Sequence, residues 1–390
     1  MTRAFSAYTN EIDDVEAAVA EIMEQLDLES KNPLLKNTFG IVSCYAEYTT
    51  SGVFEALTRA LPFEIVGITT IASMTAGVLG EMAFNIMVIT SDELSFAIAV
   101  SGEIRGEDAE KLREVYQTAS NKLSGKPAMM LSFAPLLNNF GSDFYVEEMD
   151  KISGGLPNFG TLAVDHNDDY RESRVLLNGE AFENSVAIVL IQGDIEPTFY
   201  IGSISDGKVF PEKGVVTASE GNILQEVNGL PVIEYLLSLG LTRNEGGGIT
   251  GINVFPIIVD YNDGTEPVAR VMFALTPEGY AVCGGKVPVG STLSIGSFDP
   301  AEIAATTERT LARAIADKKH NVMLIFSCIG RYFSQGYDTT AEFTQLLQPL
   351  EDAGVCYLGT YSGGEICPVY DAGGASFNRN HNNTFIICAF

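Results

Sequence analysis

The feature that most constrains the fold of this chain is an order of elements that recurs along it. Each copy begins with an apolar run of strand length and continues with a helical stretch. A second apolar run then ends in small or polar residues, and further apolar runs close the copy. The copies occupy residues 39–100, 127–191 and, in a shortened form, 321–390. They share little residue identity, but a duplicated unit of this kind predicts a layered α/β fold with mixed sheets.

The last two apolar runs of the first copy lie at residues 83–89 and 94–100. Between them stands Ser-Asp-Glu, which suits a turn. We therefore predict that these two runs form an antiparallel pair.

Length and composition point to two domains. The chain has 390 residues, of which 46% are hydrophobic, enough to bury large cores. Domain-size priors favour two units. We place the first at residues 1–210 and the second at residues 211–390, each a layered domain with mixed sheets built from the repeated strand-helix-strand-hairpin unit.

The charge of the chain restricts its partners. There are 23 Lys and Arg residues against 51 Asp and Glu residues, a formal net charge of −28. Such a field repels phosphate backbones and anionic lipid, so we expect no nucleic-acid and no membrane partner. No apolar run approaches the ~20 residues that span a bilayer, and the first residues lack the apolar core of a signal peptide. A cytoplasmic protein is expected, and its acidity either serves solubility or reflects a salt-adapted proteome.

Cysteine is used here as a small core residue. The six cysteines lie mostly in apolar runs, such as IVSCY and FIICAF, and no CxxC pair occurs. No His stands near them at metal-ligand spacing, and no glycine-rich piece ends in the Gly-Lys-Ser/Thr of a phosphate loop. We expect six free thiols in a reducing compartment, with no metal and no cofactor.

Two strands near the C-terminus predict a binding crevice. The apolar run 322–326 is followed at once by Ser-Cys-Ile-Gly-Arg, and the run 355–358 continues into Gly-Thr-Tyr-Ser-Gly-Gly-Glu. We predict that the two strands are parallel neighbours joined by a right-handed crossover through a helix at about 339–350. Their polar ends then open on one crevice, which is where open α/β sheets bind ligands.

The same residues carry a family resemblance. The motifs SCIGR, GTYSGGEICP and HNNT, in this order and spacing, resemble the C-terminal half of FIST proteins (the F-box and intracellular signal transduction domain). GTLAVD at 160–165 and Asn-Gly-Glu at 178–180 resemble the N-terminal half. The loop GITTIASMTAG at 67–77 departs from the family pattern, because it lacks the Cys-Ser/Thr and the Gly-Glu of relatives. The resemblance implies a sensory domain that binds small ligands such as amino acids.

A cation is the central candidate in the predicted crevice. The guanidinium of Arg331 suits two parallel hydrogen bonds to a carboxylate, or else it pairs with a structural acid such as Glu365. Tyr361 either stacks on a ligand or packs its strand, and the glycines before Glu365 either admit a ligand to the backbone or only permit a turn. The expected ligand-binding residues are Ser327, Cys328, Arg331, Tyr361, Gly363 and Glu365, with Thr69, Thr70 and Asp165 from the N-terminal half.

Two functions stay open on this sequence. The first is a sensor that binds an amino acid or other small organic anion and reports it to a signalling partner protein. The second is an enzyme that acts on a small metabolite in the same crevice with Cys328 and Arg331. No general base is evident for a reactive Cys328. The alternative is that Cys328 is a buried, inert thiol. Thiol-dependent turnover of a metabolite would separate the two functions, since a sensor consumes nothing.

Overall fold

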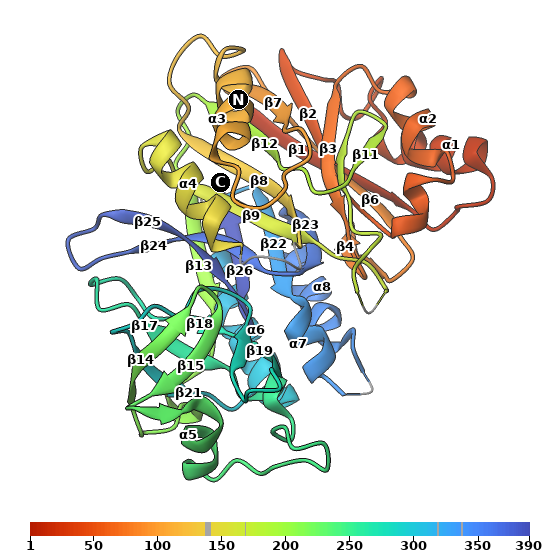
Figure 1. Ribbon diagram of the computed structural model, residues 1–390. Helices are drawn as coiled ribbons and strands as arrows, with labels where there is room; N and C mark the ends of the chain where they lie inside the picture. The colour runs from red at the N-terminus through yellow and green to blue at the C-terminus, as the bar shows by residue number, and fades with distance from the viewer. Residues whose placement is uncertain (137–141, 168, 318–319, 337) are drawn as a thin grey trace.

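The computed structural model describes residues 1–136, 142–167, 169–317, 320–336 and 338–390 (Figure 1). Three copies of one unit form the upper and central part of the view, and a group of strands inserted into the third copy lies below them. This mixed α/β architecture with several mixed sheets agrees with the expected fold class.

The three copies repeat one order of elements. The first consists of β1 (Thr2–Thr9), α1 (Val15–Leu26), β2 (Asn37–Cys44), the 3-10 helix η1 (Ala46–Thr49), α2 (Val53–Ala60), β3 (Glu64–Thr69), the hairpin β4 (Ser73–Thr75) and β5 (Val78–Gly80), and β6 (Phe84–Ser91). The second consists of β7 (Ser95–Val100), α3 (Ala109–Ser120), β8 (Met129–Pro135), α4 (Asp143–Ser153), β9 (Asn158–Ala163), the hairpin β10 (Val175–Leu177) and β11 (Glu180–Phe182), and β12 (Ala187–Gln192). The third consists of β13 (Thr198–Gly202), α6 (Pro300–Ala316), β22 (Val322–Cys328), α7 (Ile329–Ser334), α8 (Ala341–Ala353), β23 (Cys356–Ser362), the hairpin β24 (Glu365–Tyr370) and β25 (Ser376–His381), and β26 (Phe385–Ala389).

The insertion between β13 and α6, residues 203–299, is called the inserted module below. It contains the 3-10 helix η2 (Asp206–Lys208), β14 (Gly214–Glu220), β15 (Ile223–Val227), β16 (Leu230–Pro231), α5 (Val232–Ser238), the 3-10 helix η3 (Ile252–Val254), β17 (Ile257–Asp260), β18 (Val268–Arg270), β19 (Met272–Leu275), β20 (Ala281–Cys283) and β21 (Thr292–Ile295). Its eight strands form one sheet, ordered β18-β17-β21-β14-β15-β20-β19 with β16 beside β15.

Strand order is the same in the three copies. The sheets run β1-β6-β2-β3, β7-β12-β8-β9 and β13-β26-β22-β23. In each, the last two strands are parallel and the other neighbours are antiparallel. The repeat predicted from the order of elements is thus present, and it begins earlier in each copy than the sequence pattern indicated, at β1, β7 and β13.

The hairpin of each copy pairs with a strand of another copy. The hairpin β4–β5 of the first copy extends the sheet of the third by pairing with β23. The hairpin β10–β11 of the second pairs with β3 of the first, and β24–β25 of the third pairs with β9 of the second. Strands from both halves of the chain therefore share two of the sheets, and the division at residue 210 stays a prediction.

Three helices begin at a carboxylate that accepts from a free backbone N–H group of the first turn. Asp14, Asp108 and Asp299 cap α1, α3 and α6, and each accepts a hydrogen bond from the backbone N–H three residues further on. Pro300 follows Asp299 at a first helical position, where its missing N–H costs nothing.

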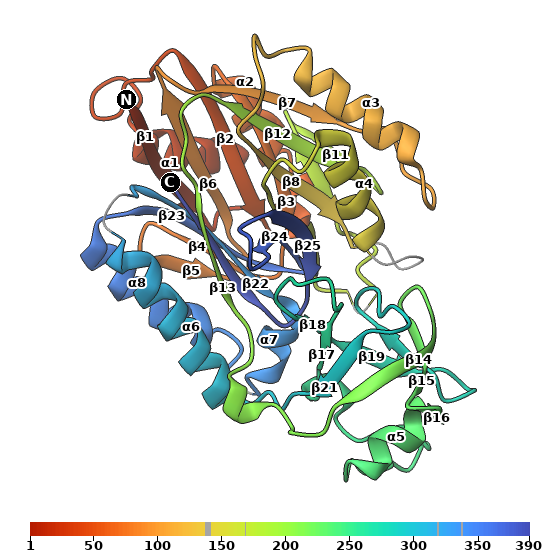
Figure 2. The same ribbon diagram turned by 90° about the vertical axis from the view of Figure 1, so that its left-hand side faces the viewer.

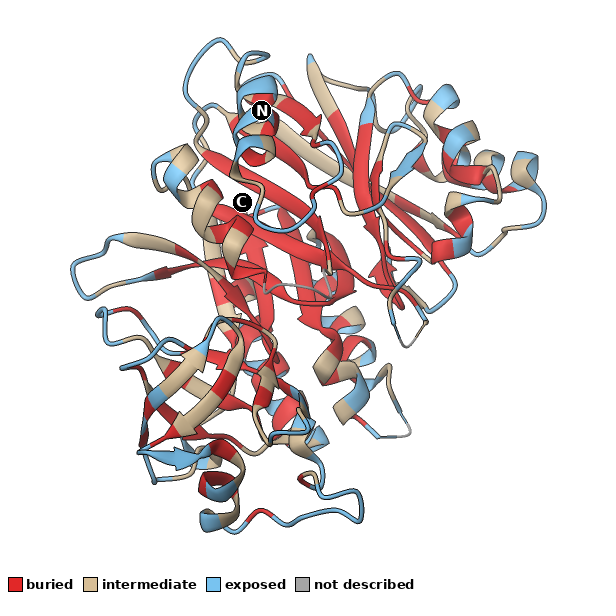
Figure 3. Cartoon of the chain, viewed as in Figure 1, coloured by how far each residue is buried: buried red, intermediate tan, exposed pale blue. Residues whose placement is uncertain are grey.

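The core lies between the three sheets and under the helices. A central cluster draws residues from all copies, including Phe39, Leu131, Phe159 and Phe326. Separate clusters fill the space between each sheet and its own helices. Figure 3 shows the outcome, with buried strands in the centre and exposed residues on the helices and loops. Strands buried on both faces explain the continuous apolar runs in the sequence.

One pairing predicted from the sequence is wrong. Strands β6 and β7 do not pair with each other; β6 lies between β1 and β2, and β7 pairs with β12. The Ser-Asp-Glu segment between them crosses from one copy to the next. Local alternation identifies two strands and a turn, but both strands pair with strands of their own copies.

Other expectations agree with the structure. Strands β22 and β23 are parallel, from Val322 opposite Cys356 to Cys328 opposite Ser362, and α8 lies in the connection between them. All six cysteines are free thiols. Among the described residues, no helix combines the length and apolar character required for a membrane crossing.

Candidate ligand-binding site

Polar side chains meet where β22 ends, β24 begins and β26 is about to start. The backbone N–H of Cys328 donates to the carbonyl of Thr384 at 2.9 Å, and the hydroxyl of Thr384 donates to Glu365 Oε2 at 2.7 Å. Glu365 in turn stands opposite Thr161 across the β24–β9 pair, so their side chains share one face of the sheet. The polar cluster is defined as Thr161, Cys328, Arg331, Glu365, Asn383 and Thr384. Its members are at most 2% exposed.

Several atoms of the polar cluster have no hydrogen-bond partner among the described residues. They include the acceptors Glu365 Oε1 and Asn383 Oδ1, the donors Arg331 Nη1 and Asn383 Nδ2, and the hydroxyl of Thr161. An unsatisfied buried polar group costs about 1–3 kcal/mol, and native proteins carry few of them. Their concentration here marks a place where a bound molecule would complete the hydrogen bonding.

Arg331 is held by Glu342 on α8. Its Nε and Nη2 lie 2.8 and 2.7 Å from Glu342 Oε1, and Nη2 also donates to the hydroxyl of Thr307 at 2.7 Å. Ser327 and Thr307 donate to the same carboxylate at 2.7 and 2.6 Å. The pair is fully buried. One edge of the guanidinium is therefore fixed, and Nη1 remains for another partner.

Glu365 is the carboxyl without such support. Burial raises its pKa well above the ordinary value, and the hydrogen bonds from Thr384 and Ser362 and the charge of Arg331 only partly oppose that rise. The side chain keeps Oε1 free of described partners. The protonation state of Glu365 should therefore change with the charge and hydrogen bonding of a neighbouring group.

Cys328 lies beside the same groups. Burial and the carboxyl of Glu365 raise the pKa of its thiol, whereas the backbone N–H groups of Gly330 and Asn383 and the charge of Arg331 lower it. A side chain on Gly330 would collide with Asn383 Oδ1 and touch Cys328 Sγ at 3.6 Å. Glycine at 330 therefore lets Asn383 approach the sulfur, which is a reason for the glycine in the SCIGR motif.

The inserted module lies beside the β24–β25 hairpin, as the views agree in showing (Figures 1 and 2). Buried Arg270 of the module pairs with Asp143 of α4 at 2.8 Å and donates to the carbonyl of Asn380 at 2.6 Å. Tyr145 Oη, Asn380 Oδ1 and Asn382 Oδ1 also have no partner among the described residues. The site thus lies near a boundary between the copies and the module.

The structure brings together some of the residues expected to bind a ligand and separates others. Cys328, Arg331 and Glu365 belong to the polar cluster. Ser327 donates to Glu342, and Tyr361 stacks on Phe343 with ring centroids 4.2 Å apart while its hydroxyl bonds Gln335.

Gly363 packs against the neighbouring copy, where a side chain would meet Val164 and Leu136. Ser327, Tyr361 and Gly363 thus have their contacts outside the polar cluster.

The three candidates of the N-terminal half lie at the junction of the copies, and each already has hydrogen bonds. Arg174 donates its backbone N–H to Thr69 Oγ1 at 2.9 Å, and Thr70 Oγ1 donates to the carbonyl of Tyr361 at 2.8 Å. Asp165 accepts four hydrogen bonds from the segment 167–173. Their part in ligand binding remains a prediction.

Sequence reasoning assigned no role to Asn383, Thr384, Thr161 or Glu342. The HNNT motif contains two of them and was a usable signal, because consecutive polar residues interrupt an apolar strand context there. Thr161 and Glu342 lie in segments with ordinary strand and helix patterns. Only the packing of β9 and α8 against the third copy reveals them.

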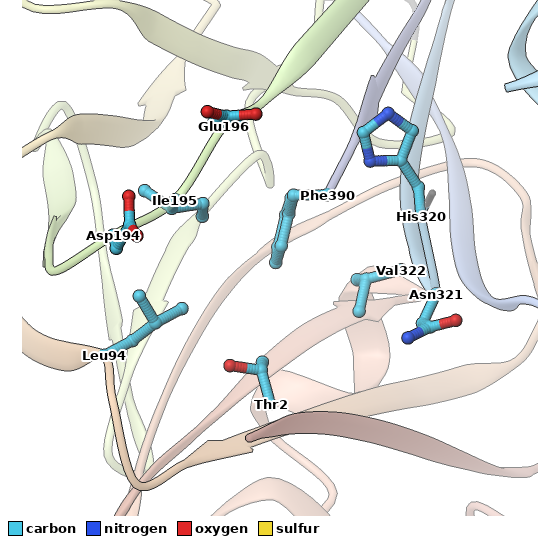
Figure 4. A pocket seen from close by; sticks show the side chains of 9 residues that line it. All are labelled: Thr2, Leu94, Asp194, Ile195, Glu196, His320, Asn321, Val322 and Phe390. Carbon is cyan, nitrogen blue, oxygen red and sulfur yellow. The ribbon is translucent and has the colours of Figure 1, made fainter. Parts of the chain in front are cut away.

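A separate cavity of about 440 Å³ lies at the other end of β22. Figure 4 shows its lining, in which Thr2 and Phe390 from the two ends of the sequence face each other with Leu94 and Ile195. Its carboxylates, Asp194 and Glu196, are exposed to solvent. This cavity therefore lacks the buried acids that distinguish the polar cluster.

Comparison with known proteins agrees with the motifs. The FIST N domain model matches residues 38–230, and the FIST C domain model matches residues 230–368. The chain belongs to the FIST family. Domains of the FIST family are associated with sensory roles in signal transduction. The matched region contains SCIGR and GTYSGGEICP of the FIST protein and ends before HNNT.

Two further comparisons were made for the FIST protein. Among solved structures, cyanuric acid hydrolase from A. caulinodans is similar with a TM-score of 0.33 and 10% sequence identity, over 100% of this chain and 99% of that chain. A search of curated proteins found no match.

Proposed function

We propose that this FIST protein is a sensor that binds a small ligand, an amino acid or other small organic anion, in the polar cluster. The observation that carries the proposal is the group of buried, unpartnered donors and acceptors around Glu365, Arg331 and Asn383. Buried polar atoms of both kinds at one place favour a ligand that both accepts and donates hydrogen bonds.

An amino acid has the required complementarity. Its carboxylate matches the free donors, Arg331 Nη1 and Asn383 Nδ2, and charge assistance strengthens such bonds. Its ammonium matches the free acceptors, Glu365 Oε1 and Asn383 Oδ1. Glu342 holds Arg331 in place before the ligand arrives, which lowers the ordering cost of binding.

The sensing role includes an output through a signalling partner protein. Among the large apolar side chains that are exposed, four lie on the inserted module, which also lies beside the site: Val215, Leu230, Phe273 and Val289. Exposed apolar side chains on the element next to a ligand site support its role in contacting a partner.

A thermal-shift screen against amino acids and small organic acids tests the proposal. Ligand at 100 times its Kd stabilises the folded state by about 2.7 kcal/mol, so a true ligand raises the melting temperature in a concentration-dependent way. Arg331→Lys keeps the charge but loses the planar fork, and it should weaken binding by about 1–3 kcal/mol in calorimetric titration.

Arg59→Lys, at an exposed helical ion pair, is the matched control and should bind like wild type. The site assignment is wrong if Arg331→Lys also binds like wild type while its circular dichroism is unchanged. The ligand class is wrong if no amino acid or organic acid shifts the melting temperature.

A further inference from the structure

The three copies supply an internal comparison for Cys328. Strand β2 ends in Val-Ser-Cys and strand β22 in Phe-Ser-Cys. Cys44 stands opposite Thr69 and Cys328 opposite Ser362, at the last residue of the parallel pair in each copy. The second copy has Pro135 at this place, opposite Ala163. Two cysteines thus occupy equivalent positions and are both buried.

Their surroundings differ. Cys44 belongs to an apolar cluster, and burial alone raises the pKa of its thiol. Burial and the carboxyl of Glu365 raise the pKa of the Cys328 thiol, whereas the backbone N–H groups of Gly330 and Asn383 and the charge of Arg331 lower it. Glu365 Oε1, Asn383 and Arg331 Nη1 are also the unpartnered atoms of the polar cluster. The fold therefore adds an acid–base group and free donors to one cysteine of an otherwise equivalent pair.

We propose that Cys328 is a nucleophile that attacks the acyl carbon of a small amide bound in the polar cluster, with Glu365 as the general base. This activity rests on the proposed ligand site, but it is the enzyme function that the sequence left open, with a small amide as the ligand. An amide presents a carbonyl oxygen to Arg331 Nη1 and Asn383 Nδ2, and an N–H group to Glu365 Oε1. These are the same donors and acceptors that the cluster leaves free.

The reaction is a hydrolysis with no net oxidation or reduction. The thiol proton passes to Glu365 as the sulfur–carbon bond forms, and the carbonyl electron pair moves onto oxygen beside Arg331 and Asn383. The carbon–nitrogen bond then breaks, and Glu365 returns the proton to the departing amine. Water attacks the thioester carbon and gives one proton to Glu365. That proton returns to the sulfur as the carbon–sulfur bond breaks, and a carboxylic acid leaves.

Glu365 is suited to this role by its position. Burial raises the pKa of its carboxyl, so the ionised carboxylate takes up a proton more readily than an exposed one. Thr384 fixes Oε2 and leaves Oε1 to exchange the proton. The sequence did not reveal this base, because Glu365 lies 37 residues beyond Cys328 and reaches it only through the β24–β26 packing.

Site-resolved alkylation tests the proposal, with iodoacetamide as a probe that is itself a small amide. Native protein is labelled for increasing times, quenched and digested, and the peptides of Cys328 and Cys44 are quantified by mass spectrometry. Cys328 should react at least about tenfold faster than Cys44, because only Cys328 has an adjacent base. Glu365→Gln should slow Cys328 by about tenfold or more and leave the rate at Cys44 unchanged.

Equal or slower labelling of Cys328 relative to Cys44 overturns the proposal, and so does an unchanged Cys328 rate in Glu365→Gln. The rate at Cys44 reports on folding, because an unfolded variant would label both cysteines at the denatured rate. In that event Glu365→Asp, which keeps the carboxylate and withdraws it by one methylene, should show an intermediate Cys328 rate.

The same measurements separate this activity from ligand binding. If a ligand raises the melting temperature but Cys328 is labelled slowly, the sensor proposal is supported and the nucleophile proposal is overturned. If labelling of Cys328 is fast and depends on Glu365, but no amino acid or organic acid raises the melting temperature, the nucleophile proposal is supported and that ligand class is wrong.

Discussion

At the scale of single residues, two buried carboxyl groups have opposite roles. Glu342 accepts from Arg331, Ser327 and Thr307, so its charge is compensated within the fold. Glu365 accepts from Thr384 and has one oxygen without a described partner. Because burial without full compensation favours the neutral form, Glu365 is the group whose titration should be visible in stability.

We predict that Glu365 makes wild-type stability fall as pH rises above about 4.5. Its folded pKa is raised above the ordinary 4.5, so the folded state holds the proton more tightly than the unfolded state. Its stabilising contribution is complete below the unfolded pKa and is lost, at about 1.4 kcal/mol per pH unit, up to the folded pKa. We would measure the free energy of unfolding in urea for wild type and Glu365→Gln between about pH 4.5 and 7.5. As pH rises, the free energy of unfolding of the variant should increase relative to that of wild type.

Glu103 should contribute to the pH dependence of stability with the opposite sign. Its pKa is lowered by the hydrogen bond from Arg105, so its contribution is present at neutral pH and is lost as pH falls. A stability difference between wild type and Glu365→Gln that is constant over this range would show that Glu365 titrates alike in both states.

At the scale of elements, the sequence reveals what each segment is but not which segment it joins. Apolar runs identified β22, β23 and their parallel pairing, because a helix in the connection requires a crossover. They also revealed the repeated unit. They did not show which strands the hairpins pair with. The partners of β4, β10 and β24 are strands of other copies.

The candidate site was predictable to the same extent. Arg331, Cys328 and Glu365 follow strand ends that can be read locally. The acid that holds Arg331 was not predictable, because Glu342 reaches it only after α7 and α8 have folded against β22. The sequence left a ligand or Glu365 as partners of Arg331, and the structure places Glu342 there.

We predict that Gly160→Ala destabilises the protein by about 1–3 kcal/mol, the usual cost of overpacking. Gly160 lies where β24 of the third copy joins β9 of the second. A side chain there would collide with the carbonyl of Ser132 and lie 2.9 Å from its Cβ and 3.0 Å from Ile366. The measurement is the urea midpoint.

Gly207→Ala is the control for this substitution, because a side chain at Gly207 meets nothing within 4 Å. Its stability should stay within about 0.5 kcal/mol of wild type. Equal urea midpoints for Gly160→Ala and Gly207→Ala would mean that the β24–β25 hairpin tolerates a wider spacing from β9.

At the scale of the whole molecule, the inserted module is joined to the copies mainly through polar contacts. Its apolar core consists of its own residues, 216–295. Across the boundary, Arg270 pairs with Asp143, Lys286 pairs with Glu147 and Arg379 pairs with Asp263. Units with separate cores and polar interfaces are expected to move relative to one another. Here the boundary borders the polar cluster, so motion of the module would change access to the site.

We predict that Arg270→Met loosens this boundary selectively. The variant keeps an apolar stem but removes the buried guanidinium that bonds Asp143 and the carbonyl of Asn380. Hydrogen exchange should accelerate at the amides of Asn382 and Lys286, which donate across the boundary to Ala269 and Asp143.

Peptides from β17 and β22 should keep their protection in Arg270→Met, because the backbone hydrogen bonds of the β17–β18 pair and of β22 do not involve the guanidinium. Arg243→Met, at an exposed pair within the module, is the matched control and should leave all of these amides unchanged. Equal acceleration in β17, β22 and the boundary amides would instead show one cooperative unit, in which the module cannot move without unfolding the copies. Selective acceleration at the boundary would identify Arg270 as the contact that holds the module beside the polar cluster, and would explain how ligand binding there can be passed to a partner.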